Sequence, residues 1–242
     1  MNYFITIIFS LLCLASQSQD TTYARQVIKK LTSKEFLGRG YVNDGVNKAA
    51  TYLSQEMKSI GLLKFGKSYE QVYEFPVNTF PGKMSVVLDG RTLTAGKHYL
   101  IYPSAKTIKA GFQLFKTDSV TYEANDGRKP FPLKVKLKKK LTYTVETEVV
   151  DNITIELLKD SFPNELKNMD VIFENKFIPR FKCRNLCGYI KGTQQPDTFV
   201  VFTAHYDHLG AMGKDAYFPG ANDNASGVSV VLNLAKYYKA HP

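Results

Sequence analysis

The sequence predicts an α/β protein with a β-rich insertion. Apolar residues recur every three or four positions from Asp44 to Ile60, which is typical of an amphipathic helix. A continuous apolar run from Thr198 to Ala204 leads into a second helical pattern, as in a central strand that helices bury on both faces. Between them, residues 78–179 alternate between apolar and polar residues, and the dipeptides Asp89-Gly90 and Asp126-Gly127 are typical of hairpin turns.

Two further elements are predicted before the insertion. Tyr23 to Leu31 carries its apolar residues on one stripe, as a short amphipathic helix does. Gly61 follows the helix predicted from Asp44 to Ile60, where a C-terminal cap belongs. The segment from Tyr69 to Val77 has the pattern of a strand.

Length and charge limit the classes of protein to consider. The chain has 242 residues, of which 44% are hydrophobic, enough for one large domain or for one domain with a sizeable insertion. Lys and Arg number 32 against 22 for Asp and Glu, a formal net charge of +10. The one dense basic run, from Lys134 to Lys140, places Lys at alternate positions around Val135 and Leu137. This pattern indicates a strand with one solvated face, of the kind that guards the edge of a sheet, and we expect no nucleic-acid partner.

The first 18 residues have the pattern of a secretory signal peptide. An apolar run from Phe4 to Leu14 is followed by the small residues Ala15, Ser16 and Ser18. The run is too short to span a membrane as a helix. A buried core helix is the alternative interpretation. We therefore expect secretion, or export to the periplasm, and no membrane span.

These patterns divide the chain into four segments. The predicted division is a signal peptide (1–18), an N-terminal part of the main domain (19–77), a β-rich insertion (78–179) and a site-bearing part of the main domain (180–242).

Cys183 and Cys187 lie four residues apart in a predicted strand. On one face of a strand this spacing separates them by roughly 13 Å, which is too far for a disulfide. We expect both to act as small core hydrophobes. A pair of metal ligands is the weaker alternative, because no second Cys pair completes such a site.

The segment AHYDHLGAMGKDAYFPGANDNASGV, from Ala204 to Val228, concentrates His and Asp after the predicted strand. His205 and Asp207 point to the same side if the strand continues, and sites in open α/β sheets form beyond the carboxyl ends of strands. A neutral imidazole is a good zinc ligand, and a metal-bound His usually donates its other ring N–H to a carboxylate or carbonyl. Asp223 comes from the loop that opens the next helix, where a carboxylate can bind one metal or bridge two. We therefore predict His205 and Asp223 as metal ligands and Asp207 as the partner of His205.

Simpler interpretations of the same residues exist. An isolated His at the end of a strand is more often hydrogen-bonded than metal-bound, and we interpret His208 in this way. The string GANDN alone indicates a turn. The combination of an apolar strand, AHYDH, PGANDNASG and an apolar helix favours the metal site.

This combination resembles metallopeptidase family twenty-eight, the co-catalytic di-zinc aminopeptidases and glutamate-carboxypeptidase-like enzymes. AHYDHLG is similar to the first metal-binding motif of that family, and FPGANDNASGV is similar to its bridging-carboxylate motif. NLCGYIKG resembles the strand that leads into the metal strand, and LTSKEFLGRGYVNDGVNKAATYLSQEMKSIGL resembles the family's N-terminal helices. The resemblance implies a zinc-peptidase-like mixed sheet flanked by helices, truncated after the first metal-loop helix.

The resemblance also implies roles and an activity. His205 corresponds to a zinc ligand, Asp223 to the carboxylate that bridges two zinc ions, and Asp207 to the catalytic residue that orients His205. The implied activity is that of an aminopeptidase-type exopeptidase, which hydrolyses peptide substrates through a zinc-activated water. Nothing in these residues selects a substrate side chain.

The sequence departs from the family pattern after this point. The family also has a Glu-Glu pair, which supplies the general base and a ligand, and a later Asp and His, and this sequence contains none of them. We therefore expect the chain to be inactive alone. Two alternatives remain open, a non-enzymatic binding protein on the same fold and a single-zinc glutaminyl-cyclase-like transferase.

Overall fold

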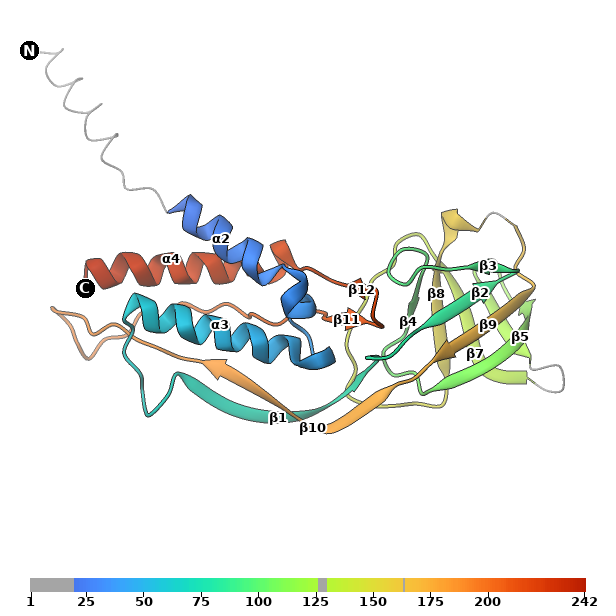
Figure 1. Ribbon diagram of the computed structural model, residues 1–242, viewed down its shortest axis with the longest axis horizontal. Helices are drawn as coiled ribbons and strands as arrows, with labels where there is room; N and C mark the ends of the chain where they lie inside the picture. Colours follow the sequence, from blue (N-terminus) through green and yellow to red (C-terminus); the bar gives the residue numbers. More distant parts are fainter. Residues whose placement is uncertain (1–19, 126–129, 163) are drawn as a thin grey trace, which may run out of the picture.

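The computed structural model describes residues 20–125, 130–162 and 164–242. The predicted signal peptide and the predicted turn at Asp126-Gly127 lie outside these ranges. Figure 1 shows an elongated molecule with the helices at one end, a β-rich sheet at the other and a long two-stranded ribbon that joins them.

Three α-helices, four short helical turns and twelve strands make up the described part of the chain. The helical elements are α2 (Thr21–Leu31), α3 (Gly45–Ile60), α4 (Ser226–Ala240), three 3₁₀ turns, η1 (Lys34–Arg39), η2 (Val42–Asp44) and η3 (Lys159–Ser161), and a π-type turn, η4 (Ala221–Ala225). The strands are β1 (Glu70–Thr79), β2 (Ser85–Leu88), β3 (Arg91–Thr92), β4 (Tyr99–Ile101), β5 (Ile108–Lys116), β6 (Thr121–Asn125), β7 (Pro130–Lys138), β8 (Ile153–Leu158), β9 (Asn168–Phe173), β10 (Lys176–Leu186), β11 (Ala211–Met212) and β12 (Ala216–Tyr217).

The two helices predicted near the N-terminus are confirmed. The Asp20 side chain accepts a hydrogen bond from the Tyr23 N–H and caps α2. Gly61 ends α3 at φ 80°, a left-handed conformation that glycine adopts without steric cost. The apolar faces of α2, α3 and α4 meet in one buried cluster that includes Val27, Leu53 and Leu232. In the described part of the chain, no helix combines the length and the apolar character that crossing a membrane requires.

A ribbon of two antiparallel strands joins the two ends of the molecule. Strands β1 and β10 pair from Glu70 opposite Leu186 to Thr79 opposite Lys176, which confirms the strand predicted from Tyr69 to Val77. The predicted limits of the insertion, at residues 78 and 179, fall inside these paired strands. The division into domains therefore stays a prediction.

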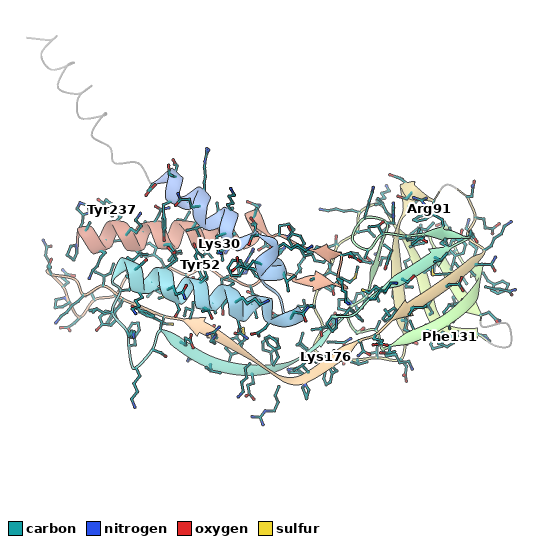
Figure 2. The ribbon with its side chains drawn as sticks, viewed as in Figure 1. Lys30, Tyr52, Arg91, Phe131, Lys176 and Tyr237 are labelled. Carbon is teal, nitrogen blue, oxygen red and sulfur yellow. The ribbon has the colours of Figure 1, made fainter. Side chains whose placement is uncertain are left out.

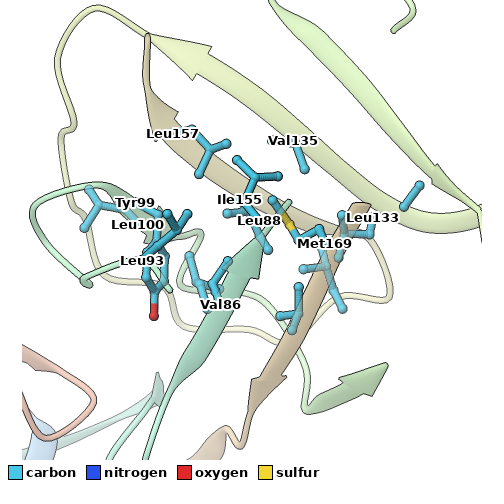
Figure 3. Close-up of a cluster of buried hydrophobic side chains, with 14 of the residues drawn as sticks. Val86, Leu88, Leu93, Tyr99, Leu100, Leu133, Val135, Ile155, Leu157 and Met169 are labelled. Atoms are coloured by element: carbon cyan, nitrogen blue, oxygen red, sulfur yellow. The ribbon is translucent and has the colours of Figure 1, made fainter. Parts of the chain in front are cut away.

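The β-rich end is one eight-stranded sheet. Its strand order is β3-β2-β9-β5-β6-β7-β8-β4, and every neighbouring pair is antiparallel except β7 and β8. The sheet curls around a core of buried apolar side chains, part of which Figure 3 shows, including Val86, Leu93, Leu133, Ile155, Leu157 and Met169. Residues 78–179 thus have the β-rich character that their alternating pattern indicates.

The basic run in β7 has one solvated face, as predicted, but its place in the sheet differs. Leu133 and Val135 are fully buried, and the lysines between and beyond them are exposed. Strand β7 lies between β6 and β8, so the prediction of an edge strand is wrong. Alternation reports that one face of a strand is solvated, and it does not report whether both edges are paired.

The predicted central strand from Thr198 to Ala204 is wrong. This segment forms no strand, and its apolar side chains are exposed, with Phe199, Val200 and Val201 at 66%, 79% and 76% of full exposure. A strand needs a neighbour to take its backbone N–H and C=O groups. Within the described residues no strand pairs with this segment, and β1 and β10 form a sheet of two strands only.

The two cysteines differ in burial. Both are free thiols, and Cys183 is buried, as predicted. Cys187 is exposed, so its predicted place in the core is wrong. The reason is that the buried face of β10 ends at Cys183, since Asn185, two residues further along the same face, is already exposed.

The tight turn between β2 and β3 has a left-handed backbone. Asp89 and Gly90 join the paired residues Leu88 and Arg91, with φ of 46° and 80°. A Cβ at Gly90 would meet nothing within 4 Å, so the cost of Gly90→Ala lies in the backbone alone. We expect this substitution to lower the free energy of unfolding by about 1 kcal/mol, measured by urea denaturation.

Gly66→Ala is the matched control for Gly90→Ala. A Cβ at Gly66 also meets nothing within 4 Å, and its φ is not in the left-handed region. This control should leave the urea midpoint unchanged or raise it slightly. Equal losses in the two variants would contradict the assignment of strain to Gly90.

Candidate metal centre

A buried arginine lies beneath the predicted site. Arg39, in η1, is 0% exposed, and its guanidinium donates only to backbone carbonyls. The acceptors are the carbonyl oxygens of Tyr206 (2.8 Å), Leu31 (3.0 Å), Pro219 (2.7 Å), Gly220 (2.8 Å) and Asp223 (3.3 Å). One side chain therefore ties together η1, the end of α2 and the two loops that hold the predicted ligands.

Two glycines beside Arg39 let these loops approach closely. The backbone N–H of His208 donates to the Arg39 carbonyl, and that of Gly210 donates to the Gly38 carbonyl, each at 3.0 Å. A Cβ at Gly40 would lie 2.3 Å from the Gly210 Cα, and a Cβ at Gly38 would lie 2.4 Å from the Gly210 carbonyl oxygen. Since side chains at these positions would clash with backbone, the string LGRG is required for the contact.

The structure brings His205 and Asp223 together although 18 positions separate them in the sequence. His205 Nε2 lies 3.1 Å from Asp223 Oδ1. Asp223 lies in η4, immediately before α4, and the peptide bond after it is cis. Their side chains keep 55% and 67% of their full exposure, so the pair opens to solvent.

Asp207 lies on the other side of the His205 ring. His205 Nδ1 is 3.2 Å from the Asp207 carbonyl oxygen and 3.3 Å from Asp207 Oδ1. The Tyr41 hydroxyl donates to Asp207 Oδ2 at 3.3 Å. Burial and the nearby Asp207 carboxylate raise the pKa of Tyr41, so its hydroxyl stays protonated and remains a donor.

His208, interpreted from the sequence as a hydrogen-bonded residue outside the metal site, lies against the same carboxylate. Its Nδ1 is 3.6 Å from Asp223 Oδ2, and its side chain keeps 12% exposure. Burial, followed by the charge of Arg39, lowers the pKa of His208 and favours the neutral ring. Burial also lowers the pKa of the Arg39 guanidinium, while Asp207 and Asp223 act in the opposite direction.

Sequence reasoning missed Arg39, Tyr41 and the position of His208. The available signal for Arg39 was its place between Gly38 and Gly40, which indicates a loop in close contact with other backbone. Tyr41 and His208 carried no signal of their own. Tyr41 contacts Asp207 across 166 residues of sequence, and His208 contacts Asp223 across the loop that contains the β11–β12 hairpin.

The spacing of the donor atoms fits one coordination sphere. Zinc binds His nitrogen and Asp oxygen at about 2.0–2.2 Å in a tetrahedral arrangement, which places two donor atoms roughly 3.3 Å apart. The His205 Nε2 to Asp223 Oδ1 distance of 3.1 Å is close to this value. Among the described residues, however, no group of three or more His, Cys, Asp or Glu side chains is arranged so that it could hold a metal ion. The described chain therefore brings two candidate donor atoms together and not a closed site.

His205, Asp207, His208 and Asp223 gather where two loops meet before α4. Comparisons with known proteins show what this chain is similar to. Residues 185–242 match the model of Peptidase family M28, which confirms the resemblance inferred from the motifs. Over 59 residues, 24% of this chain, the sequence is 39% identical to a probable zinc metalloprotease of Pyricularia oryzae. That match covers 12% of the metalloprotease.

Solved structures show a similar fold along almost the whole chain. An aminopeptidase from Aneurinibacillus sp. strain AM-1 has a TM-score of 0.53 at 16% identity, over 92% of this chain and 60% of its own. The zinc aminopeptidase BSAP from Bacillus subtilis has a TM-score of 0.55 at 15% identity, over 93% and 59%. A Peptidase M28 precursor from Shewanella amazonensis SB2B has 0.55 at 14%, over 92% and 64%. The chain thus has the α/β fold of these three proteins and spans about 60% of their length.

Arg39→Met should destabilise the protein strongly. The substitution keeps the volume of the aliphatic stem and leaves several buried carbonyls without a donor, and each hydrogen bond to a charged group is worth about 1.5–3 kcal/mol. We expect the free energy of unfolding to fall by at least about 3 kcal/mol in urea denaturation. Arg39→Lys should lose nearly as much, since an ammonium cannot reproduce the planar fork of donors.

Arg91→Met is the control for Arg39→Met. Arg91 also donates to a backbone carbonyl, that of Ser161 at 3.2 Å, but its side chain is exposed. Figure 2 labels it at the β-rich end of the molecule, away from the helices. Its loss should change the free energy of unfolding by about 0.5 kcal/mol or less. If the two variants lost similar stability, Arg39 would not have the structural role described above.

Proposed function

We propose that this chain is part of a secreted, zinc-dependent peptidase of the aminopeptidase type, which acts on peptide substrates at a di-zinc site. The observation that carries the proposal is the 3.1 Å approach of His205 Nε2 to Asp223 Oδ1. Both residues lie in the segment that matches Peptidase family M28, and similar folds are found in zinc aminopeptidases.

The surroundings of His205 support its role as a ligand through Nε2. A proton on Nδ1 can be donated to the Asp207 carbonyl oxygen or carboxylate, which lie at 3.2 and 3.3 Å. This tautomer leaves the Nε2 lone pair free to face the metal position. Asp207 is thus proposed to orient His205, and Tyr41 holds Asp207 in place through its hydroxyl.

The two oxygens of Asp223 face different partners, which supports a bridging role. Oδ1 lies 3.1 Å from His205 Nε2, while Oδ2 faces His208 Nδ1 at 3.6 Å. A bridging carboxylate needs its oxygens presented to two different metal positions. When bound, zinc lowers the pKa of a coordinated water and polarises the scissile carbonyl.

Residues 1–18 support export of the protein. Their apolar run followed by small residues is typical of a signal peptide. Secretion, or export to the periplasm, is therefore part of the proposal.

Two other functions remain as alternatives with different expected results. A non-enzymatic binding protein on this fold would show no metal-dependent hydrolysis even in a longer polypeptide. A single-zinc glutaminyl-cyclase-like transferase would bind one metal ion per chain. Metal stoichiometry and a hydrolysis assay on a longer polypeptide distinguish the peptidase, the binding protein and the transferase.

Removal of either proposed ligand should weaken metal binding strongly. We expect His205→Ala and Asp223→Asn each to weaken Zn²⁺ binding, measured by calorimetric titration of the full chain, by more than the 10–100-fold that loss of an outer partner costs. Asp207→Asn should fall within about 10–100-fold, because Asp207 acts through His205.

His241→Ala is the control for these variants. His241 is exposed at the far end of α4, where its Nδ1 contacts the Tyr237 carbonyl oxygen. The His241→Ala chain should bind Zn²⁺ with the same affinity as the unaltered chain. Zinc affinity that survives in both His205→Ala and Asp223→Asn would contradict the assignment of the ligands.

We expect the 242-residue polypeptide to hydrolyse no aminoacyl arylamide at a measurable rate, with or without zinc. In its described part, no third His, Cys, Asp or Glu joins His205 and Asp223 to complete a metal site. Arylamide turnover is the measurement, beside a longer polypeptide encoded by the same reading frame. Turnover by the 242-residue chain that a chelator abolishes would show that the chain is active alone.

A further inference from the structure

The loop between the two proposed ligands carries a hairpin that enters the β-rich half of the molecule. Strands β11 and β12 pair through Ala211 opposite Tyr217 and Met212 opposite Ala216. Met212 is 0% exposed and belongs to the buried core of the eight-stranded sheet, not to the core of the helices. Figure 1 shows this hairpin between the helices and the β-rich sheet.

Two further contacts hold the hairpin to the β-rich half. The Phe218 ring stacks on the buried Tyr143 ring, with centroids 4.7 Å apart and planes 8° apart. The Gly213 N–H donates to the Phe80 carbonyl at 2.8 Å, and a Cβ at Gly213 would crowd Met84 at 3.0 Å. The hairpin is therefore packed, stacked and hydrogen-bonded to the sheet.

Phe218 is also continuous with the metal loop. It is followed by Pro219 and Gly220, whose carbonyls accept from Arg39. A Cβ at Gly220 would lie 2.4 Å from the His208 ring and 2.5 Å from the Asp223 carbonyl oxygen, so this backbone fits tightly between them. A shift of Phe218 must therefore move the residues around Asp223 or break the Arg39 contacts.

We infer that the stack of Phe218 on Tyr143 is a positioning contact, through which the β-rich half fixes the loop that holds Asp223 opposite His205. The β-rich insertion thus has a role at the site, although none of its described residues is among the proposed ligands. The expected effect of this contact on metal binding rests on the proposed function. Its expected effect on the order of the loop from residue 205 to residue 225 is independent of that function.

The experiment compares Phe218→Ala with Phe131→Ala in the full chain. Phe131 is a matched control, because it is also partly buried against the same core and pairs with another ring, that of Phe112, at 4.8 Å. It lies in β7, far from the hairpin, as Figure 2 shows. Tyr143→Phe is the conservative variant, since it keeps the stacked ring and removes only the hydroxyl.

Two readouts separate a positioning role from a merely structural one. Hydrogen exchange of residues 205–225 reports the loop without metal, and Co²⁺ alone, titrated by its visible absorption, reports the site. We expect Phe218→Ala to speed exchange in residues 205–225 and to weaken Co²⁺ binding by about 10–100-fold, as for other outer partners of a metal site. Phe131→Ala should change neither, and Tyr143→Phe should behave as the unaltered chain.

The outcomes distinguish the two proposals. Equal exchange rates of residues 205–225 in Phe218→Ala and Phe131→Ala would overturn the positioning role, whatever the Co²⁺ affinity of the two variants. Faster exchange confined to Phe218→Ala, with no Co²⁺ binding by any chain, would support the positioning role and contradict the proposed metal site. Faster exchange together with weaker Co²⁺ binding supports both.

Discussion

The burial of one positive charge governs the geometry of this site. A guanidinium with no exposure to water is stable only if its donors are satisfied, and Arg39 meets this need with backbone carbonyls from three separate segments. Moving any of these segments outward would leave one or more donors of a buried charge without an acceptor, which costs more than the loss of a typical surface contact. The end of α2, the loop after His205 and the loop before Asp223 are therefore fixed relative to one another. The glycines on either side of Arg39 permit this arrangement by letting backbone meet backbone.

The loop that carries Asp223 is held from a second direction as well. Met212, the last residue of β11 in the hairpin within this loop, packs in the core of the eight-stranded sheet. A loop held by a buried charge at its base and by apolar packing at its tip has little freedom to move. This explains how His205 and Asp223 face each other while both side chains stay largely exposed to water. The support lies in the buried surroundings, and the proposed ligands themselves remain open for a metal ion.

The sequence predicted the elements that local patterns determine. Helices α2 and α3 have clear periodicity and end signals, and the His205 and Asp223 motif lies within a short stretch of chain. The segment from Thr198 to Ala204 failed because an apolar run does not specify a pairing partner. Arg39 was missed for a similar reason. Its five acceptors are spread from residue 31 to residue 223, and no local pattern reports contacts of that range.

The charges around the site explain why a cation would bind to so basic a chain. The chain as a whole carries a formal charge of +10, which disfavours metal cations at long range. At the site, the carboxylates of Asp207 and Asp223 act on a single guanidinium, that of Arg39, and burial lowers the pKa of His208, which favours its neutral ring. The carboxylates therefore outnumber the guanidinium by one. Arg39 reduces the repulsion between the two carboxylates without neutralising both, so they can lie close together and still attract a cation. The same buried residue thus fixes the backbone of the site and reduces the negative field of its two carboxylates.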